Sequence, residues 1–449
     1  MGKSVPGKDR IINILVAVVG LIAAMLRTFY IYYTPAWRRQ HDVLNFGADE
    51  GQAAFIEFFH QGHLLLDFDP REKWGFFQAP LHHMLAALWI RLQELIGFDY
   101  HDACEHVQVL TLIYSLVAMY FGYRLLKYFR LSGEALLLSF ALFALHPGFI
   151  LMSGSINNDM LSIMLTVMAI YYGLRWNDEP DWKYTVILAF VIGLGMMTKL
   201  STGLIAPAVA LLFIVKWIQG GISKFPGFLL KYLVFIVICA PLALWSPVRN
   251  LLKFGVPLGY TPEVGEPVLS SAAARIFDLR CKTPYLSRIT NGDPFDEFNI
   301  FLGMMKTSLF GDENFTLAVS EAGHSGVGAF LMTVFGWSVL ISGSLVALIC
   351  FYSTIRVLIT KRYIASAVIR AYLGTIYLTA LLMYVSFMFK APFSSSMDFR
   401  YVLYLIPVEA LMLGLYVRDG RKGIRTVAFI TVAVFSLSTV LLYVMLSRG

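Results

Sequence analysis

Apolar residues recur along this chain in runs long enough to cross a lipid bilayer. A helix needs about 20 mostly apolar residues to span the roughly 30 Å of hydrocarbon. The first run is longer than the apolar core of a signal peptide and lacks a small-residue cleavage site, so it is expected to remain as a helix. The pattern predicts an all-α polytopic membrane protein with about eleven spans, at residues 11–33, 107–126, 135–152, 161–174, 184–197, 204–217, 228–244, 327–353, 365–388, 401–416 and 427–446.

The composition supports this class and excludes others. Hydrophobic residues make up 58% of the 449 residues and charged residues 14%, whereas an ordinary soluble chain has about 45–50% and about 25%. So few charged side chains cannot cover a soluble protein of this length. A soluble enzyme, a nucleic-acid-binding protein, a fibrous protein and a disordered chain are therefore excluded.

The net charge of +7 is explained first by topology. Basic side chains concentrate in the cytoplasmic loops of membrane proteins. The sequence is therefore predicted to have its amino terminus in the cytoplasm and its carboxyl terminus outside. Just over half of the 36 lysines and arginines lie on alternate connections between the predicted spans, in groups at residues 3–10, 124–130, 175–183, 216–231, 356–370 and 418–425.

The same topology puts two long polar segments, residues 34–106 and 249–326, on the outer side. The second is rich in Pro and Gly and is expected to be a large loop. Within the first, residues 81–96 (LHHMLAALWIRLQELI) have helical periodicity but are too short to span, which is typical of a helix lying along the membrane interface. Residues 1–449 are thus predicted to form one transmembrane domain, and no soluble domain is expected after the last span.

Acidic residues are scarce near the predicted spans, so the adjacent pair Asp49 and Glu50 is informative. The pair precedes an amphipathic stretch in the first outer segment. Carboxylates in this position can cap a helix and interact with its dipole. They can also serve as a general base in a pocket at the outer face of the membrane. Both interpretations remain open at this point.

A second polar group connects two predicted spans on the outer side. His146 and Pro147 are followed closely by Ser153-Gly154-Ser155-Ile156-Asn157-Asn158-Asp159. A polar turn that caps two helices would explain these residue types. The density of amide and carboxylate groups in so short a connection favours a functional site.

Cations at the outer ends of separate spans form a third element. One such cation alone is most simply a snorkelling anchor. Several together predict an anion site suited to a phosphate. These cations are Arg27, Lys199, Arg249, Lys390 and Arg400, the last two flanking Ser394-Ser395-Ser396-Met397-Asp398.

Signals for a metal ion or a disulfide are weaker. Asp67-Phe68-Asp69 has the carboxylate spacing of metal-dependent sugar transferases, but such a triplet is common by chance. Four outer histidines have no spacing that fixes a tetrahedral zinc site, and no metal cofactor is expected. A disulfide between Cys104 and Cys281 is compatible with the topology. The four histidines are His60, His63, His82 and His83.

These motifs together resemble a known family. An Asp-Glu pair in the first outer segment, followed by Gln-Ala-Pro-Leu-His at residues 78–82, resembles the lipid-linked-sugar glycosyltransferases of the GT-C fold. The similarity is to bacterial relatives of protein O-mannosyltransferases and of the aminoarabinose transferase that modifies lipid A. Further matching segments are His146-Pro147, residues 153–159, Thr198-Lys199, Pro247-Val248-Arg249-Asn250, Gly255-Val256-Pro257 and Asp398-Phe399-Arg400-Tyr401.

The resemblance implies an inverting transfer of a sugar from a polyprenyl-phosphate carrier to an extracytoplasmic acceptor, in a bacterial cytoplasmic membrane. The acceptor is a protein, a lipid or a cell-envelope glycan. In this family the first-loop Asp is the catalytic carboxylate, which corresponds to Asp49 with Glu50 beside it. The expected substrate-binding residues are Arg27, Gln78, His82, Asn158, Asp159, Lys199, Arg249, Lys390, Arg400 and Tyr401.

One departure concerns the carrier phosphate. Some relatives have Lys-Pro where this sequence has Ala79-Pro80. A phosphate contact would then have to come from Arg27, Lys199, Arg249 or Arg400.

A transporter or flippase of lipid-linked saccharides is the main alternative. Transporters typically place charges and broken helices near the bilayer midplane. Here the notable polar residues gather at the outer ends of the spans, which favours the transferase. Its expected partners are a polyprenyl-phosphate-linked sugar, the acceptor and membrane lipid, with no nucleic acid.

Overall fold

The computed structural model describes residues 6–36, 46–262, 271–281, 283–285, 299–311, 315, 319, 322–391 and 397–446. No β-strand occurs in these residues. Short 3-10 helices are η1 (Met152–Gly154), η2 (Leu200–Ile205), η3 (Ile222–Lys224) and η5 (Phe399–Leu405). The α-helices are α1 (Pro6–Tyr33), α2 (Gln52–His60), α3 (Leu81–Leu95), α4 (Tyr100–Glu105), α5 (Val107–Tyr128), α6 (Gly133–Ala144), α7 (Pro147–Leu151), α8 (Asp159–Asp178), α9 (Trp182–Thr198), α10 (Ala206–Gly220), α11 (Phe225–Phe254), α12 (Ala272–Phe277), α13 (Ile300–Phe310), α15 (Val327–Ile359), α16 (Ala367–Lys390), α17 (Ile406–Arg418) and α18 (Lys422–Leu446).

The all-α multi-pass class is confirmed, whereas the count of eleven spans is not. Each predicted segment is largely helical, but length and composition identify eight helices in the described residues that can cross a membrane. The other three predicted segments correspond to α6, α8 and α9. Helices α6 and α9 are apolar but have only 12 and 17 residues. The eight are Arg10–Tyr33, Tyr100–Tyr128, Leu200–Gly220, Ile222–Phe254, Val327–Ile359, Ala367–Lys390, Phe399–Arg418 and Lys422–Leu446.

The predicted span at residues 135–152 is interrupted rather than continuous. Helix α6 ends at Ala144 and the short α7 begins at Pro147. Proline disfavours a helical conformation in the residue before it. That residue, His146, is extended, and its Nδ1 accepts a hydrogen bond from the Gly148 N–H at 3.2 Å. His146 is therefore the N-cap of α7.

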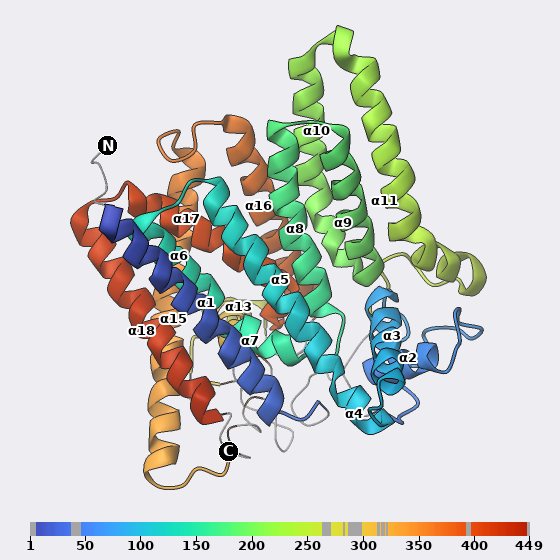
Figure 1. The fold of residues 1–449 in the computed structure, drawn as a ribbon, viewed down its shortest axis with the longest axis horizontal. Helices are drawn as coiled ribbons and strands as arrows, with labels where there is room; N and C mark the ends of the chain where they lie inside the picture. Colours follow the sequence, from blue (N-terminus) through green and yellow to red (C-terminus); the bar gives the residue numbers. More distant parts are fainter. Residues whose placement is uncertain are drawn as a thin grey trace.

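The bundle is arranged around α8. Helices α1, α6, α15, α17 and α18 lie on one side of it and α9, α10 and α11 on the other (Figure 1). Close approach is possible where a glycine faces a neighbour. A Cβ added to Gly173 of α8 would lie 2.3 Å from the Tyr372 hydroxyl of α16. Without a side chain there, Tyr372 donates to the Ile170 carbonyl at 3.2 Å, which ties α16 to the central helix.

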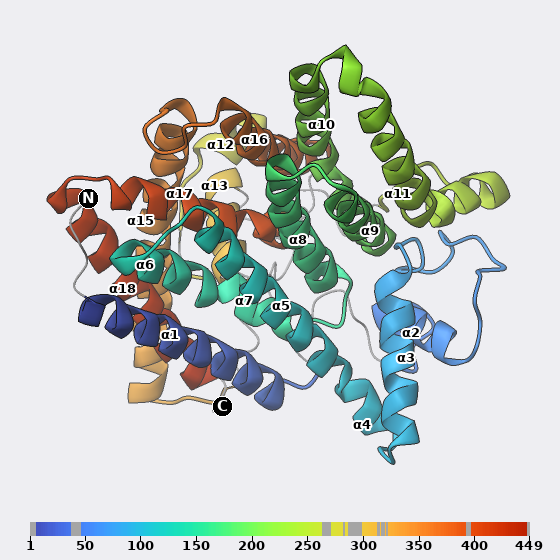
Figure 2. The ribbon, with the colours of Figure 1, turned by 45° about the horizontal axis from the view of Figure 1, so that its top comes forward.

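The described residues of the first segment predicted to be outer (residues 34–106) form a small lobe beside the bundle. Helices α2 and α3 pack together there, and α4 joins the lobe to α5 (Figures 1 and 2). The lobe has its own apolar core, which includes Phe55, Phe76 and Ile90. A helix at residues 81–96 is thus confirmed as α3. Residues 37–45 of this segment lie outside the described residues.

The second outer segment is not simply a loop, contrary to the sequence-based expectation. It contains α12 and α13, and α13 packs into the bundle against α7 and α15. Leu309 and Phe310 of α13 are almost fully buried. The Thr307 hydroxyl also donates to the Met397 carbonyl at 2.9 Å, just before η5. At 11 residues, α13 is too short to give a span signal, and the Pro- and Gly-rich flanks concealed it.

Candidate functional site

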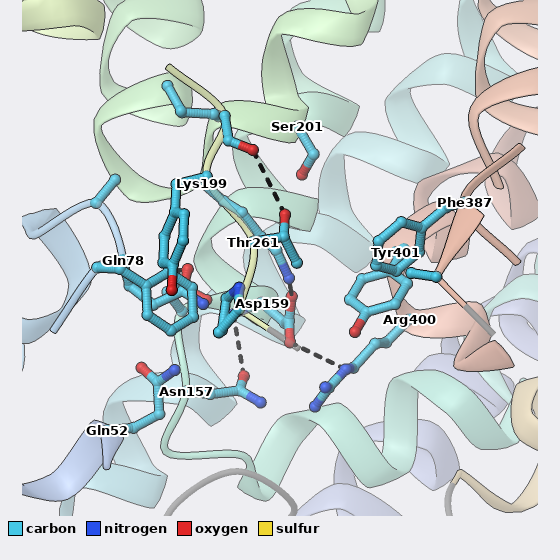
Figure 3. Close-up of a pocket in the computed structure, with 18 of the residues that line it drawn as sticks. Gln52, Gln78, Asn157, Asp159, Lys199, Ser201, Thr261, Phe387, Arg400 and Tyr401 are labelled. Atoms are coloured by element: carbon cyan, nitrogen blue, oxygen red, sulfur yellow. Dashed lines mark hydrogen bonds and ion pairs between the residues drawn. The ribbon is translucent and has the colours of Figure 1, made fainter. Parts of the chain in front are cut away.

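A pocket of about 330 Å³ lies where several helices end on one side of the bundle. Its lining comes from the start of α2, the segment before α3, the first residue of α8, the segment after α9, the end of α16 and the start of η5. Residues 259–262, which follow α11, also line it. The polar helix ends singled out in the sequence therefore meet around one cavity (Figure 3).

Four charged side chains form a charge cluster at this pocket: Asp159, Lys199 and Arg400, which line it, and Asp398, which pairs with Arg400 but does not line it. The Lys199 ammonium donates to Asp159 Oδ1. Arg400 Nε lies 3.4 Å from Asp159 Oδ2 and 3.1 Å from Asp398 Oδ2. The side chain of Lys199 is 17% exposed, whereas those of Asp159 and Arg400 are 5% and 4% exposed. Lys199 is thus the cation of the cluster with the greatest access to the cavity.

Tyr401 lies against both cations. The Lys199 ammonium is 4.7 Å from its ring centroid and the Arg400 guanidinium carbon 5.3 Å. Cation–π contacts of this length favour a fixed position for each charge. Figure 3 shows Asp159 in the middle of the group, with Arg400 and Tyr401 on one side and Gln78 on the other. The structure thus brings Asp159, Lys199, Arg400 and Tyr401 together, as their proposed common role requires.

Asparagine side chains hold the start of α8 in place. Asn157 Oδ1 accepts from the Asp159 N–H at 3.0 Å. Asn158 precedes α8 but makes no side-chain cap. Its amide instead donates to the Thr198 carbonyl at 2.8 Å and to Gln78 Oε1 at 3.2 Å. Because these bonds reach the end of α9 and the segment before α3, the connection does more than cap a helix.

His82 is hydrogen-bonded to the connection before α8. It is fully buried and its Nε2 lies 2.6 Å from the Ile156 carbonyl oxygen. Burial lowers the pKa of His82 to about 4, so the ring is neutral at physiological pH. A neutral ring that faces a carbonyl donates through Nε2. His82 does not line the pocket itself, and its effect on a substrate would pass through residues 156–159.

Asp49 and Glu50 lie on an exposed turn beside the pocket and do not line it. They therefore lie outside the pocket in which a general base was expected. The turn is held by the Gly51 N–H, which donates to the Trp74 carbonyl at 2.7 Å. Gly51 is the N-cap of α2 and no side chain caps this helix, so the capping interpretation of the acidic pair is wrong.

Arg249 and Lys390 lie at the edge of the site. Arg249 donates to the Leu66 carbonyl and lines a small cavity that shares Gln78 with the main pocket. Lys390 is the exposed last residue of α16, next to Ala391 in the pocket lining. Neither belongs to the charge cluster. The neighbouring Ser394, Ser395 and Ser396 lie outside the described residues.

Arg27 is not at the rim, contrary to the expectation of a phosphate contact. It is fully buried between α1, α5 and α6. Its guanidinium donates to Ser115 Oγ at 2.9 Å and to the Ala144 carbonyl at 2.8 Å. A buried guanidinium needs such acceptors, which explains its location. Arg27 therefore joins helices and takes no part in the pocket.

Replacing Arg27 by Met should weaken the fold without impairing the site. The loss of the hydrogen bonds to Ser115 and Ala144 is expected to lower the free energy of unfolding by about 1–3 kcal/mol. Thermal unfolding in detergent measures this effect. Turnover per folded molecule should stay unchanged, and a selective loss of turnover would restore Arg27 to the site.

The residues considered for metal and disulfide bonds have other partners. Asp69 forms an ion pair with Arg71 at 2.6 Å, and this pair lowers the pKa of the carboxyl. His60 pairs with Glu94 at 2.9 Å. The described residues contain no group of three or more metal-ligating side chains. All four cysteines, including Cys104 and Cys281, are free, so the disulfide is not formed.

Several pocket residues were not anticipated from the sequence. Gln52 is the first residue of α2, and Trp74 and Phe77 lie in the segment before α3. Tyr260 comes from the second outer segment and packs against Phe77, with ring centroids 5.9 Å apart. The sequence feature that could have identified two of them is an aromatic residue beside a glycine, as in Trp74-Gly75 and Gly259-Tyr260.

Residues 80–245 match the family model described as dolichyl-phosphate-mannose-protein mannosyltransferase. That range contains α3 with His82, α8 with Asp159, and α9, which ends at the residue before Lys199. No curated protein sequence matches the chain.

Similar folds occur among solved structures. ArnT from Cupriavidus metallidurans bound to undecaprenyl phosphate has a TM-score of 0.55 at 12% identity, covering 96% of this chain and 77% of that one. The apo state of the same protein has a TM-score of 0.52 at 14% identity, covering 96% of this chain and 76% of that one. The Archaeoglobus fulgidus oligosaccharyltransferase in the apo form gives 0.50 at 15% identity, covering 96% of this chain and 56% of that one. The shared fold shows that the chain is a multi-pass membrane protein of the GT-C fold, and residues 80–245 are similar to a glycosyltransferase family.

Proposed function

We propose that the protein transfers a sugar, with inversion, from a polyprenyl-phosphate carrier to a hydroxyl acceptor at the extracytoplasmic face of the membrane. The charge cluster in a pocket at the ends of membrane helices is the observation that carries this proposal. A polyprenyl tail stays in the lipid, so the protein must bind its phosphate near the membrane surface, where the helices end. The solved ArnT structure bound to undecaprenyl phosphate supports the same class of carrier.

Lys199 is the proposed partner of the carrier phosphate. It is the most accessible cation of the cluster and lies on the pocket wall. Arg249 would support it from the adjoining cavity, which shares Gln78 with the pocket. Cations at this position stabilise the charge that develops on the phosphate as the bond to the sugar breaks.

Asp49 is the proposed general base. The acceptor oxygen attacks the anomeric carbon, the bond from that carbon to the phosphate oxygen breaks, and the acceptor proton passes to the Asp49 carboxylate. A single in-line displacement of this kind inverts the anomeric configuration. Only two residues separate Asp49 from Gln52 in the pocket lining, so the Cα atoms of Asp49 and Gln52 are at most about 11 Å apart. An exposed base beside the pocket suits an acceptor that arrives from outside the membrane.

The basic connections support the proposed orientation. The amino-terminal end of α1 and the α10–α11 connection lie at the end of the bundle opposite the α2–α3 lobe (Figure 1). With the basic end in the cytoplasm, the pocket opens on the outer side. The second outer segment contributes Tyr260 and Thr261 to the pocket and is our candidate for selecting the acceptor.

The decisive experiment measures release of free polyprenyl phosphate by the purified protein. A panel of polyprenyl-phospho-sugars is supplied with cell-envelope extract as the source of acceptor. Release from one donor, dependent on the extract, is the expected result. If no donor is consumed, the transferase proposal fails, and transport of lipid-linked saccharides into sealed vesicles becomes the activity to test.

A further inference from the structure

Gln52 occupies an unusual position for an uncharged polar residue. It is the first residue of α2, it is only 2% exposed, and it lines the pocket. Burial of an amide is costly unless both of its halves have partners. The position of Gln52 therefore needs an explanation beyond helix formation, because Gly51 and not Gln52 is the cap of α2.

One half of the Gln52 amide is anchored by a histidine. Gln52 Oε1 lies 2.5 Å from His83 Nε2 on α3. His83 is fully buried, and its ring packs on Phe55 with centroids 4.5 Å apart. This contact spans the α2–α3 lobe, so the orientation of the amide is set by the packing of that lobe rather than by the pocket.

The chemistry of His83 determines which half of the amide remains for a ligand. Burial, and to a lesser extent the neighbouring His82, holds the pKa of His83 well below its usual value, so the ring is neutral. The amide oxygen can only accept, and the His83 Nε2–H is then the donor. The amide nitrogen of Gln52 is left to donate. In Figure 3 this nitrogen is on the side that faces Asn157.

We propose that Gln52 donates a hydrogen bond to a hydroxyl of the transferred sugar, and that His83 is the positioning residue that fixes this donor. The assignment rests on the proposed function. An uncharged amide donor suits a neutral hydroxyl, whereas the charge cluster already supplies cations for the phosphate. A site that offers a hydrogen bond to a substrate hydroxyl discriminates against analogues that lack it, because its polar group is then left unpaired.

The test compares the donor that wild-type protein uses with analogues that differ from it by one deoxy position or one epimeric hydroxyl. Gln52→Ala should raise KM for the natural donor about tenfold, the usual upper size of one neutral hydrogen bond, with kcat little changed. It should also remove the preference over one particular analogue and leave the others unaffected. Gln61→Ala, at the exposed far end of α2, is the matched control and should change neither quantity.

Two variants of His83 separate positioning from folding. His83→Phe keeps an aromatic ring against Phe55 but removes the N–H, and it should weaken discrimination at the same sugar position as Gln52→Ala. His83→Gln restores a donor and should recover part of the preference. Loss of stability without a change in discrimination would show that the pair is merely structural.

The outcomes distinguish this assignment from the function on which it rests. Active wild-type protein with an unchanged analogue pattern in Gln52→Ala overturns the assignment and leaves the transferase intact. Wild-type protein that consumes no polyprenyl-phospho-sugar overturns both.

Discussion

Replacing Asp49 by Asn should lower sugar transfer by a factor of about 100 to 10,000, the usual contribution of a general base. The substitution keeps the size of the side chain and removes its ability to accept the acceptor proton. Because Asp49 is exposed and caps no helix, folding and membrane insertion should be unaffected. Release of polyprenyl phosphate in the presence of acceptor measures the effect.

Asp67→Asn is the matched control for this prediction. Asp67 is an exposed aspartate of the same outer segment, outside both the turn and the pocket lining. Its variant should transfer sugar at the wild-type rate. Equal turnover in Asp49→Asn and Asp67→Asn would remove Asp49 from the mechanism and direct the search for a base to Glu50.

The second large effect is expected at Asp159. Asp159→Asn removes the ion-pair partner of Lys199 and leaves Asp398, which pairs with Arg400, as the one remaining carboxylate of the charge cluster. Removing one partner of a buried ion pair typically costs about 3–5 kcal/mol, so thermal stability should fall clearly. Transfer should fall by at least about 100-fold, because a displaced Lys199 no longer presents its ammonium at the pocket wall.

A double variant separates the two parts of this effect. Asp159→Asn combined with Lys199→Met removes one charge of each sign and should recover much of the stability. It should not recover transfer, since the proposed phosphate partner is then missing. Recovery of both would mean that the cluster serves the fold alone, whereas recovery of neither would contradict the pairing seen between Asp159 and Lys199.

The sequence was most informative where apolar runs end. Asn158, Asp159, Lys199 and Arg400 each lie at such an end, and the direction of the spans predicts that these ends face the same side. Their convergence on one pocket follows from that rule, because antiparallel helices in a bundle bring every second connection together. Charged and polar side chains are costly in the hydrocarbon core, so they are found at the ends of the spans. Their positions in the sequence can therefore indicate a site before the packing of the helices is known.

Features that depend on contacts between distant residues could not be predicted in this way. Arg27 has the sequence position of a rim cation, yet its partners Ser115 and Ala144 lie about a hundred residues away and hold it inside the bundle. Gln52 gave no signal because its significance comes from His83 on another helix. Helix α13 was concealed because the bundle, and not its own length, stabilises it.

The composition of the charge cluster has a consequence for how a donor reaches the pocket. The formal charges of its two carboxylates and two cations sum to zero, so their fields largely cancel at a distance. At physiological ionic strength, salt screens electrostatic interactions over about 8 Å. Because the net charge of the cluster is small, this screening should have little effect on it. Capture of an anionic lipid head would then depend on lateral diffusion in the leaflet and on fit at short range, and would be largely insensitive to salt.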